Sequence, residues 1–312
     1  MKKIFYNVIR FVFDSNWRTS WLAYNGLYNH MNDSEYLKKI FVVRCGYELD
    51  LTSPRSYNEK LQWLKLHDRN PEYSKMVNKY EVKEYVADKI GENYIIPTLG
   101  VWDNFDDIDF NSLPDQFVLK CTHDSGGLVI CKDKSTLNKT RAKKKINKSL
   151  KRDYYLTGRE WPYKNVKPRI IAEEYMEDEK TAELRDYKFF CFDGEVKALF
   201  IATERQKPGE EVKFDFFDEN FNHLPIRQGH PNAKVPPKKP EKFEEMKVLA
   251  AKLSEGIPHV RVDFYEVNGK IYFGEMTFFH FSGMMPFEPR EWDNVFGGWV
   301  NISKIQIKDT IQ

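Results

Sequence analysis

The sequence predicts an α+β protein with two lobes and a helical N-terminal extension. The early segments have helical patterns, whereas most later segments pair as antiparallel hairpins with tight turns at Asp193-Gly194 and Asn268-Gly269. This order differs from the strand–helix alternation of a parallel sheet. Since 312 residues exceed what one compact core usually organises, we expect an extension over 1–75 and lobes over 76–175 and 176–312.

The first half of the chain is predicted to be mainly helical. Helices are expected over 56–68, before Asn70-Pro71, and over about 73–90, which ends at Gly91. The apolar run 94–97 predicts a short strand, and 116–120 a stronger one.

The second half is predicted to be mainly antiparallel. Its expected elements are, in order, a hairpin over 121–133, a Lys-rich helix over 135–152, a buried strand at 170–172, two strands within 184–204, an irregular excursion over 206–240, a helix over 241–255 and a last hairpin turning at 268–269.

Composition narrows the classes of function and the compartment. The chain has 49 Lys and Arg against 47 Asp and Glu, so whole-protein binding to nucleic acid is not expected. Its four cysteines have neither metal-ligand spacing nor a disulfide pattern, which favours a reducing cytosol. No apolar run approaches the ~20 residues of a membrane-spanning helix, and the opening segment has no secretory cleavage pattern. We therefore expect a cytoplasmic protein.

The N-terminal segment has helical spacing of apolar side chains beside basic ones. The residues concerned are Lys2, Lys3, Ile4, Phe5, Val8, Ile9, Arg10 and Val12. Such a helix can pack onto the protein's own body or a partner subunit, which we favour. The alternative is peripheral contact with the cytoplasmic face of the inner membrane.

The last hairpin carries the most informative set of side chains. Arg261 and Asp263 lie two apart on one strand, and Glu275 and Thr277 lie two apart on the next, so each pair shares a face. Counting from the turn places Asp263 nearly opposite Glu275. Two adjacent carboxylates repel unless a cation or a shared proton intervenes, and their hard oxygens suit Mg²⁺ bound to phosphates. The alternative is a solvated face with ordinary ion pairs.

A second segment combines a strand-end Lys with a glycine turn. Lys120 ends an apolar strand, and His123, Ser125, Gly126 and Gly127 follow it. A lysine there can contact phosphate, and glycines let backbone N–H groups approach a polyphosphate closely. A plain hairpin turn is the alternative. His123 is interpreted either as a proton shuttle or as a hydrogen-bonded structural residue.

Two further strands offer groups for a nucleotide. After Ile170-Ile171-Ala172 come Glu173, Glu174 and Tyr175, where a base can lie against the strand and a carboxylate can bind ribose. Asp186 and Lys188 alternate with apolar residues along the next strand, and Lys188 is a candidate phosphate contact. Solvent-exposed charges are the alternative for both segments.

Together these segments resemble the ATP-grasp superfamily, and more closely its TupA-like members from bacterial surface-polysaccharide loci. The supporting segments are 57–63, 113–120, 123–127, 168–175 and 186–194. The resemblance spans about residues 50–300. It implies an ATP-grasp fold whose two lobes enclose Mg-ATP, with a reduced pre-ATP-grasp region at the start of 76–175 and a metal-binding hairpin in 176–312.

The resemblance also implies a role for each candidate residue. The expected catalytic residues are Arg261, Lys188 and His123; the expected nucleotide-binding residues are Lys83, Lys120, Ser125, Gly126, Gly127, Glu173, Glu174, Tyr175 and Asp186; the expected Mg²⁺ ligands are Asp263, Glu275 and Thr277. Two positions depart from the family pattern. Asn78 replaces a common acidic residue, and Thr277 replaces the usual Asn ligand.

Three functions remain open at this point. The leading one is an ATP-dependent carboxylate–amine ligase that forms an amide on a uronic acid, or on another carboxylate of a capsule, teichuronic acid or lipopolysaccharide, with an amino acid as a candidate amine. Thr277 motivates a second, a glycosyltransferase or sugar kinase on the same frame. The third is a non-catalytic assembly protein.

Overall fold

The computed structural model describes residues 10–179, 184–204 and 209–305. Most of the apolar N-terminal pattern, from Ile4 to Ile9, lies outside them. Within the described ranges, no helix combines the length and apolarity that crossing a bilayer requires. The chain divides into two compact units, one of Met1–Arg69, Tyr155–Trp161 and Phe279–Gln312, the other of Asn70–Tyr154 and Pro162–Phe278. The boundaries expected at 75 and 175 stay predictions.

The first unit is helical. Its elements are α2 (Ser15–Tyr24), α3 (Asp33–Cys45), α4 (Tyr57–His67), α8 (Tyr155–Gly158), the 3₁₀ turn η5 (His280–Gly283) and α10 (Glu291–Trp299). Helix α4 begins with a capping box, because Ser56 accepts from the Glu59 backbone while the Glu59 side chain accepts from that of Ser56.

A buried lysine of α4 holds the turn η5 in this unit. Lys65 Nζ donates to Gln62 Oε1 at 2.9 Å, to the Ser282 carbonyl at 2.8 Å and to Ser282 Oγ at 2.9 Å. Phe281 and Ser282 have backbone φ angles of 48° and 58°, values that residues other than glycine rarely adopt. Burial lowers the pKa of Lys65 to about 8. The ammonium therefore links α4 to a strained backbone turn.

The second unit contains two antiparallel sheets. The smaller has the order β1-β4-β2-β3, from β1 (Thr98–Trp102), β2 (Phe117–Cys121), β3 (Leu128–Cys131) and β4 (Ile170–Glu174). The other elements of this unit before β5 are α5 (Glu72–Val77), α6 (Val82–Ile90), η1 (Glu92–Tyr94), η2 (Phe105–Asp107), η3 (Lys134–Thr136) and α7 (Lys139–Leu150), and the 3₁₀ turn η4 (Trp161–Tyr163) begins at the last residue of a segment of the first unit.

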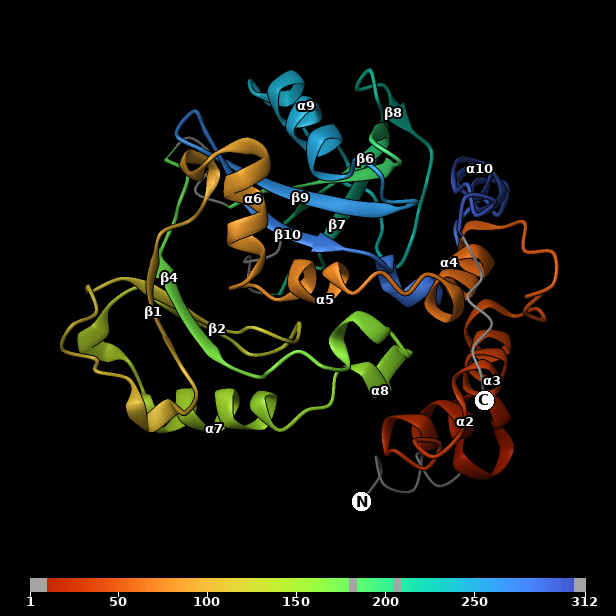
Figure 1. The fold of residues 1–312 in the computed structure, drawn as a ribbon, viewed down its shortest axis with the longest axis horizontal. Helices are drawn as coiled ribbons and strands as arrows, with labels where there is room; N and C mark the ends of the chain where they lie inside the picture. Colours follow the sequence, from red (N-terminus) through yellow and green to blue (C-terminus); the bar gives the residue numbers. More distant parts are fainter. Residues whose placement is uncertain (1–9, 180–183, 205–208, 306–312) are drawn as a thin grey trace. The chain divides into compact units, whose positions relative to one another are not determined.

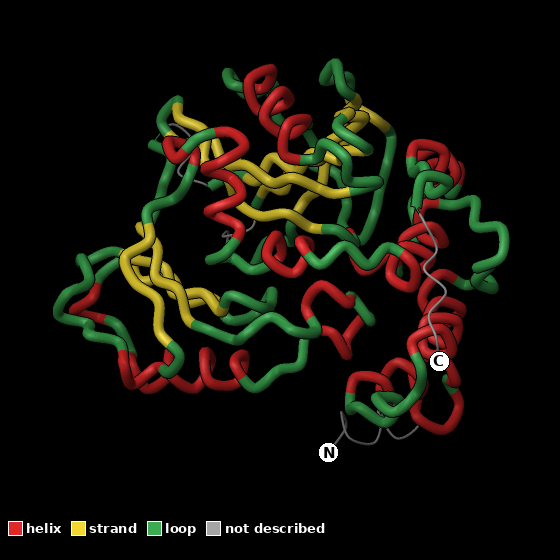
Figure 2. Tube along the Cα trace, viewed as in Figure 1, coloured by secondary structure: helices red, strands yellow, loops and turns green. Residues whose placement is uncertain are grey.

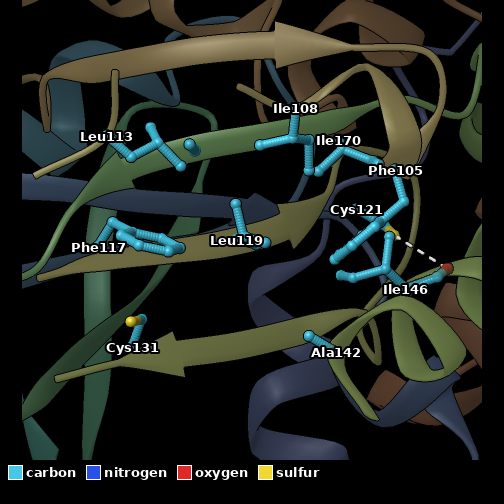
Figure 3. Close-up of a cluster of buried hydrophobic side chains, with 11 residues drawn as sticks. Phe105, Ile108, Leu113, Phe117, Leu119, Cys121, Cys131, Ala142, Ile146 and Ile170 are labelled. Carbon is cyan, nitrogen blue, oxygen red and sulfur yellow. Dashed lines mark hydrogen bonds between the residues drawn. The ribbon is translucent and has the colours of Figure 1, made fainter. Parts of the chain in front are cut away.

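Helix α7 covers one face of the smaller sheet, as Figure 1 shows. Alternation along β2 turns Phe117, Leu119 and Cys121 to this face, where they meet Ala142 and Ile146 of α7 (Figure 3). The Cys121 thiol also donates to the Ile146 carbonyl at 3.8 Å. Because this face is filled, the opposite face of β2 and β4 remains for polar side chains.

The larger sheet has the order β10-β9-β5-β6-β7-β8. Its elements, with the helix that packs on it, are β5 (Asp186–Phe192), β6 (Glu195–Thr203), β7 (Lys213–Asp218), β8 (His223–Leu224), α9 (Phe243–Leu253), β9 (Val260–Val267) and β10 (Lys270–Thr277). Helix α9 contacts β5, β6 and β9 (Figure 2). Strands β5 and β9 are central and almost wholly buried, so charged side chains on them need partners.

The helix predicted over 73–90 is divided into α5 and α6 but ends before Gly91 as predicted, whereas the strand predicted over 94–97 is wrong. The helix breaks because Asn78 leaves helical geometry and its side-chain oxygen accepts the backbone N–H of Tyr80 at 3.0 Å. Only Tyr94 of the apolar run belongs to a 3₁₀ turn, and the run continues without regular structure to Pro97, which has no N–H to donate. The strand begins one residue later, at Thr98.

The excursion predicted over 206–240 is also corrected, since part of it belongs to the larger sheet. Strand β7 pairs with β6, and its four central residues, 214–217, are buried. The buried carboxylate of Asp215 has two polar partners: His223 Nε2 lies 3.1 Å from it, and the Ala233 N–H donates to it at 3.2 Å. The other hairpins predicted, over 121–133, 184–204 and 260–277, are confirmed.

Candidate functional site

A row of charged side chains crosses three neighbouring strands of the larger sheet. Lys188 on β5 lies opposite Asp263 on β9, and Asp263 lies opposite Glu275 on β10. Residues directly opposite in an antiparallel ladder share a face. Two positions along the ladder, and therefore on the same face, Arg261 lies opposite Thr277. The structure therefore brings together the residues predicted from the hairpin.

A one-residue bulge at Gly274 produces this alignment. The ladder runs regularly from the turn until Phe273 pairs with Phe264, and then Glu275 pairs with Asp263. Gly274 is the extra residue, and a Cβ there would lie 3.1 Å from the Asp263 carbonyl oxygen. A bulge lets two residues on one strand oppose one on the other. Asp263 is thus opposite Glu275 and not merely near it, as counting had predicted.

Arg261 neutralises the two carboxylates. Its Nε and Nη2 donate to the Asp263 oxygens at 2.7 and 2.8 Å, and Nη2 also lies 3.2 Å from Glu275 Oε1 and 3.0 Å from Thr277 Oγ1. Lys188 forms a short ion pair with the same Asp263 carboxylate. Asp263 is 1% exposed, and these two cations supply the counter-charges that a buried carboxylate requires.

Lys188 extends the charged row to Asp186. Its ammonium lies 3.4 Å from Asp186 Oδ2, two residues earlier on the same strand. The structure therefore places Asp186 with the hairpin carboxylates, whereas the sequence interpretation had grouped it with nucleotide contacts.

The oxygens of this row fit a magnesium ion that is completed by phosphate and water. Asp263 and Glu275 supply carboxylates and Thr277 a hydroxyl, and Mg²⁺ usually takes one or two protein carboxylates beside substrate phosphates. Within the described ranges no cluster of three His, Cys, Asp or Glu side chains could hold a metal by itself. The donor set thus matches a metal that arrives with a nucleotide.

A pocket in the second unit combines cationic and apolar walls. It is lined by Lys79, Lys83, Ile95, Ile96, Lys120, Glu173, Phe273 and Gly274. The three lysines suit phosphate, and the pocket is narrow, with a volume of about 10 Å³. Gly274 belongs to the bulge that aligns Asp263 with Glu275, so the pocket and the charged row meet at β10.

Glu173 holds two of these lysines. Its two carboxylate oxygens lie 2.6 Å from Lys83 Nζ and 2.6 Å from Lys120 Nζ. Lys83 Nζ also donates to the Ile96 carbonyl and to Thr98 Oγ1, each at 2.7 Å. Both ammonium groups are thereby directed to one point of the pocket by a single buried carboxylate.

Burial and charge compete at this cluster. Burial would raise the pKa of Glu173, but the charges and hydrogen bonds of Lys120 and Lys83 outweigh it, so the pKa lies below its ordinary value. Burial lowers the pKa of Lys83, against the opposing charge of Glu173. The carboxylate therefore remains ionised as long as the lysines keep their charge.

Glu174 and Tyr175 do not join the cluster of Glu173. Glu174 is the next residue on the strand, so its side chain points to the other face and is exposed. Together with Tyr175 it lines a second hollow, where Lys132 Nζ lies 5.2 Å from the Tyr175 ring centroid. Their assignment to the nucleotide stays a prediction.

The glycine turn after β2 is held by an aspartate. Asp124 accepts the Gly127 N–H at 3.2 Å and forms a short hydrogen bond with Ser149 of α7. Lys79 Nζ donates to the Asp124 carbonyl at 2.5 Å. Ser125 and Gly126, at the tip, are exposed. The turn is thus fixed at its base and accessible at its tip.

Gly127 and Gly126 are expected to respond differently to alanine. At Gly127 a Cβ would lie 2.5 Å from both Cys121 Sγ and Ser149 Oγ, whereas at Gly126 the nearest atom is 3.5 Å away. We expect Gly127→Ala to lower the free energy of unfolding by about 1 to 3 kcal/mol, and Gly126→Ala to change it by less than about 0.5 kcal/mol. Urea unfolding of both variants measures this, and equal losses would contradict the packing argument.

His123 lies beneath the turn and not at its tip. It is 3% exposed, and its Nε2 lies 3.2 Å from the Arg152 carbonyl oxygen. Its Nδ1 is buried and has no hydrogen-bond partner among the described residues. Burial lowers its pKa, so the ring is neutral near pH 7. This environment favours a structural role, although the catalytic assignment stays a prediction.

Sequence reasoning missed several residues of the pocket. Lys79, Ile95 and Ile96 line the pocket, and Thr98 accepts a hydrogen bond from Lys83 beside it. The signal for Lys79 was present in the segment that also contains Lys83. Its four-residue spacing from Lys83 is the signal that could have found it, since residues four apart share a helix face.

The two antiparallel sheets, the pocket with its lysines and the hairpin of paired oxygens define an α+β nucleotide-binding protein of the ATP-grasp class. A family model described as TupA-like ATP-grasp matches residues 59–301. The chain belongs to this family, and the predicted family and fold class are confirmed. A search of the curated proteins found no significant match.

Solved structures with distant similarity include three ligases. D-alanine–D-alanine ligase from Helicobacter pylori has 12% identity and a TM-score of 0.44 over 80% of this chain and 67% of its own. The ATP-grasp ligase PsnB, complexed with minimal precursor, Mg and ADP, has 11% identity and a TM-score of 0.38 over 70% of this chain and 57% of its own. D-alanine–D-alanine ligase from Bacillus anthracis, complexed with ATP, has 14% identity and a TM-score of 0.37 over 65% of this chain and 54% of its own. The chain spans between about half and two thirds of the length of these proteins.

Proposed function

We propose that this protein is a Mg-ATP-dependent carboxylate–amine ligase. In the proposed reaction the γ-phosphoryl group of ATP is transferred to a substrate carboxylate, which yields an acyl phosphate and ADP. An amine then attacks the acyl carbon, loses a proton and displaces phosphate, and an amide remains. The proposal is supported by membership of the family and by the charges around the pocket.

The observation that carries the proposal is the pairing of Lys83 and Lys120 on one buried carboxylate. Both ammonium groups lie 2.6 Å from Glu173, in a pocket that also has apolar walls. The phosphates of a nucleotide would replace or share this negative charge, while Ile95 and Ile96 offer contact for the base. The cations are therefore fixed in place before the ligand binds.

The hairpin residues would act next to the transferred group. Arg261 has donors on both carboxylates and is positioned to neutralise charge that develops during phosphoryl transfer. Asp263, Glu275 and Thr277 would hold Mg²⁺, which when bound supplies electrostatic stabilisation to phosphate oxygens. Lys188 holds the Asp263 carboxylate in place through their ion pair.

The proposed acceptor is a carboxylate of a bacterial surface polysaccharide, such as a uronic acid. This proposal rests on the resemblance to TupA-like proteins of polysaccharide loci. A transferase is the second candidate, because Thr277 replaces the usual Asn ligand and its hydroxyl is already held by Arg261 at 3.0 Å.

Product analysis separates these reactions. The full chain is incubated with Mg²⁺, ATP, glucuronic or galacturonic acid derivatives and amino acids, and ADP, free phosphate and new masses are measured. A ligase releases ADP and phosphate in equal amounts together with an amide. ADP without free phosphate indicates a kinase, and consumption of a sugar nucleotide without ATP indicates a glycosyltransferase. Absence of ATP turnover with every acceptor pair would count against the ligase.

A further inference from the structure

Helix α7 and the residues after it have the most uneven charge in the chain. Between Lys139 and Arg152 there are eight basic residues and no acidic one. Removing these eight leaves 41 basic against 47 acidic residues, so the remainder of the chain has a net charge of −6. A nearly neutral protein thus concentrates positive charge on one helix.

The fold directs this charge outward. Ala142, Ile146 and Ser149 are the buried residues of α7, and they face the smaller sheet. The basic residues on the outer face recur at helical spacing and are exposed: Arg141, Lys144, Lys145 and Lys148. Residues separated by three, four and seven positions lie on one side of a helix. They therefore form a single cationic stripe.

No acidic side chain among the described residues neutralises the stripe. Lys143, at its border, pairs with Asp106 at 2.7 Å. Within the described part of the chain, the side chains of the stripe, Arg141, Lys144, Lys145 and Lys148, have no acidic partner. Four adjacent like charges repel one another, so an external anionic surface would lower their energy.

We propose that α7 docks on the anionic phospholipid surface of a membrane through this stripe. A flat array of phosphates complements a convex helix whose cations point outward. Clusters of four to eight basic residues on a helix have this preference. A soluble anionic polymer is less suited, since neither of the two hollows described above includes an α7 residue and α7 contains no aromatic side chain for stacking on sugars.

The test compares two variants with equal loss of charge. One is Arg141→Gln/Lys144→Gln/Lys145→Gln/Lys148→Gln. Its control is Lys234→Gln/Lys238→Gln/Lys252→Gln/Lys270→Gln, at exposed lysines that have no acidic partner among the residues described. Binding of the full chain to vesicles of phosphatidylcholine with phosphatidylglycerol, and of phosphatidylcholine alone, is measured by co-sedimentation at two salt concentrations. Circular dichroism confirms that both variants are folded.

We expect binding only to the vesicles that contain phosphatidylglycerol, with weaker binding at higher salt. Each neutralised residue of the stripe should lower the partition coefficient about fivefold, so the α7 variant should lose a few hundredfold while the control stays close to the unsubstituted chain. Equal losses in both variants would overturn the proposal. Binding of soluble polygalacturonate through α7 without vesicle binding would overturn it in favour of a polymer.

Discussion

Asp263→Asn is expected to lower the free energy of unfolding by about 3 to 5 kcal/mol. Asp263 is buried and pairs with both Arg261 and Lys188, so the neutral side chain leaves two cations without their main counter-charge. The same change should weaken Mg²⁺-dependent binding of a non-hydrolysable ATP analogue by at least about tenfold. Urea unfolding and calorimetric titration, with and without Mg²⁺, measure the two effects.

Glu275→Gln is the matched control for stability. The Glu275 side chain is 39% exposed, and its contact with Arg261 is longer, at 3.2 Å. Solvent screens this pair, so the loss of stability should stay below about 1 kcal/mol. If Glu275 is a metal ligand, its loss of Mg²⁺-dependent affinity should nevertheless resemble that of Asp263→Asn. If the Mg²⁺ dependence of nucleotide binding is unchanged in both variants, the hairpin residues are not the metal ligands.

Glu173→Gln should have the second large effect, a loss of about 3 kcal/mol or more in the free energy of unfolding. Without the carboxylate, the ammonium groups of Lys83 and Lys120 remain close together in a buried pocket. Inorganic pyrophosphate should restore part of the stability, because its oxygens supply the missing negative charge. Glu174→Gln, on the exposed face of the same strand, should change stability by less than about 0.5 kcal/mol.

The contribution of Glu173 to the free energy of unfolding should depend on pH. The pKa of Glu173 in the folded protein lies below the ordinary value of 4.5. Its contribution is therefore fully present above pH 4.5 and is lost as the pH falls through the folded pKa. The unfolding free energies of the unsubstituted chain and of Glu173→Gln should converge below pH 4.5. A constant difference across that range would show that the ion pairs are not its cause.

The sequence predicted the hairpin chemistry well because strands alternate strictly. An Asn-Gly turn set the pairing of β9 with β10, and two-residue spacing grouped Arg261 with Asp263. Lys120 was found for the same reason, as the end of an apolar strand. In these cases a local pattern was sufficient to place the side chain.

Other parts depended on contacts that no local pattern shows. Glu173 and Glu174 were grouped because the sequence did not reveal that β4 continues through both, which sends them to opposite faces. Strand β7 was taken for an irregular segment because Pro and Lys surround it, yet burial of Asp215 is made possible by His223 and Ala233. Strand pairing decided the first outcome, and tertiary hydrogen bonds decided the second.

The bulge at Gly274 has a consequence for how such sites are encoded. With uninterrupted alternation, the even-numbered residues of β10 would share the face of Asp263, because Tyr272 lies opposite Tyr265. The single extra residue reverses this parity, so Glu275 and Thr277 lie there instead. The oxygen pair is thus specified by the length of the chain between the turn and Glu275 as well as by the identity of the ligands. Removing one residue from that interval would disturb the site even with every ligand retained.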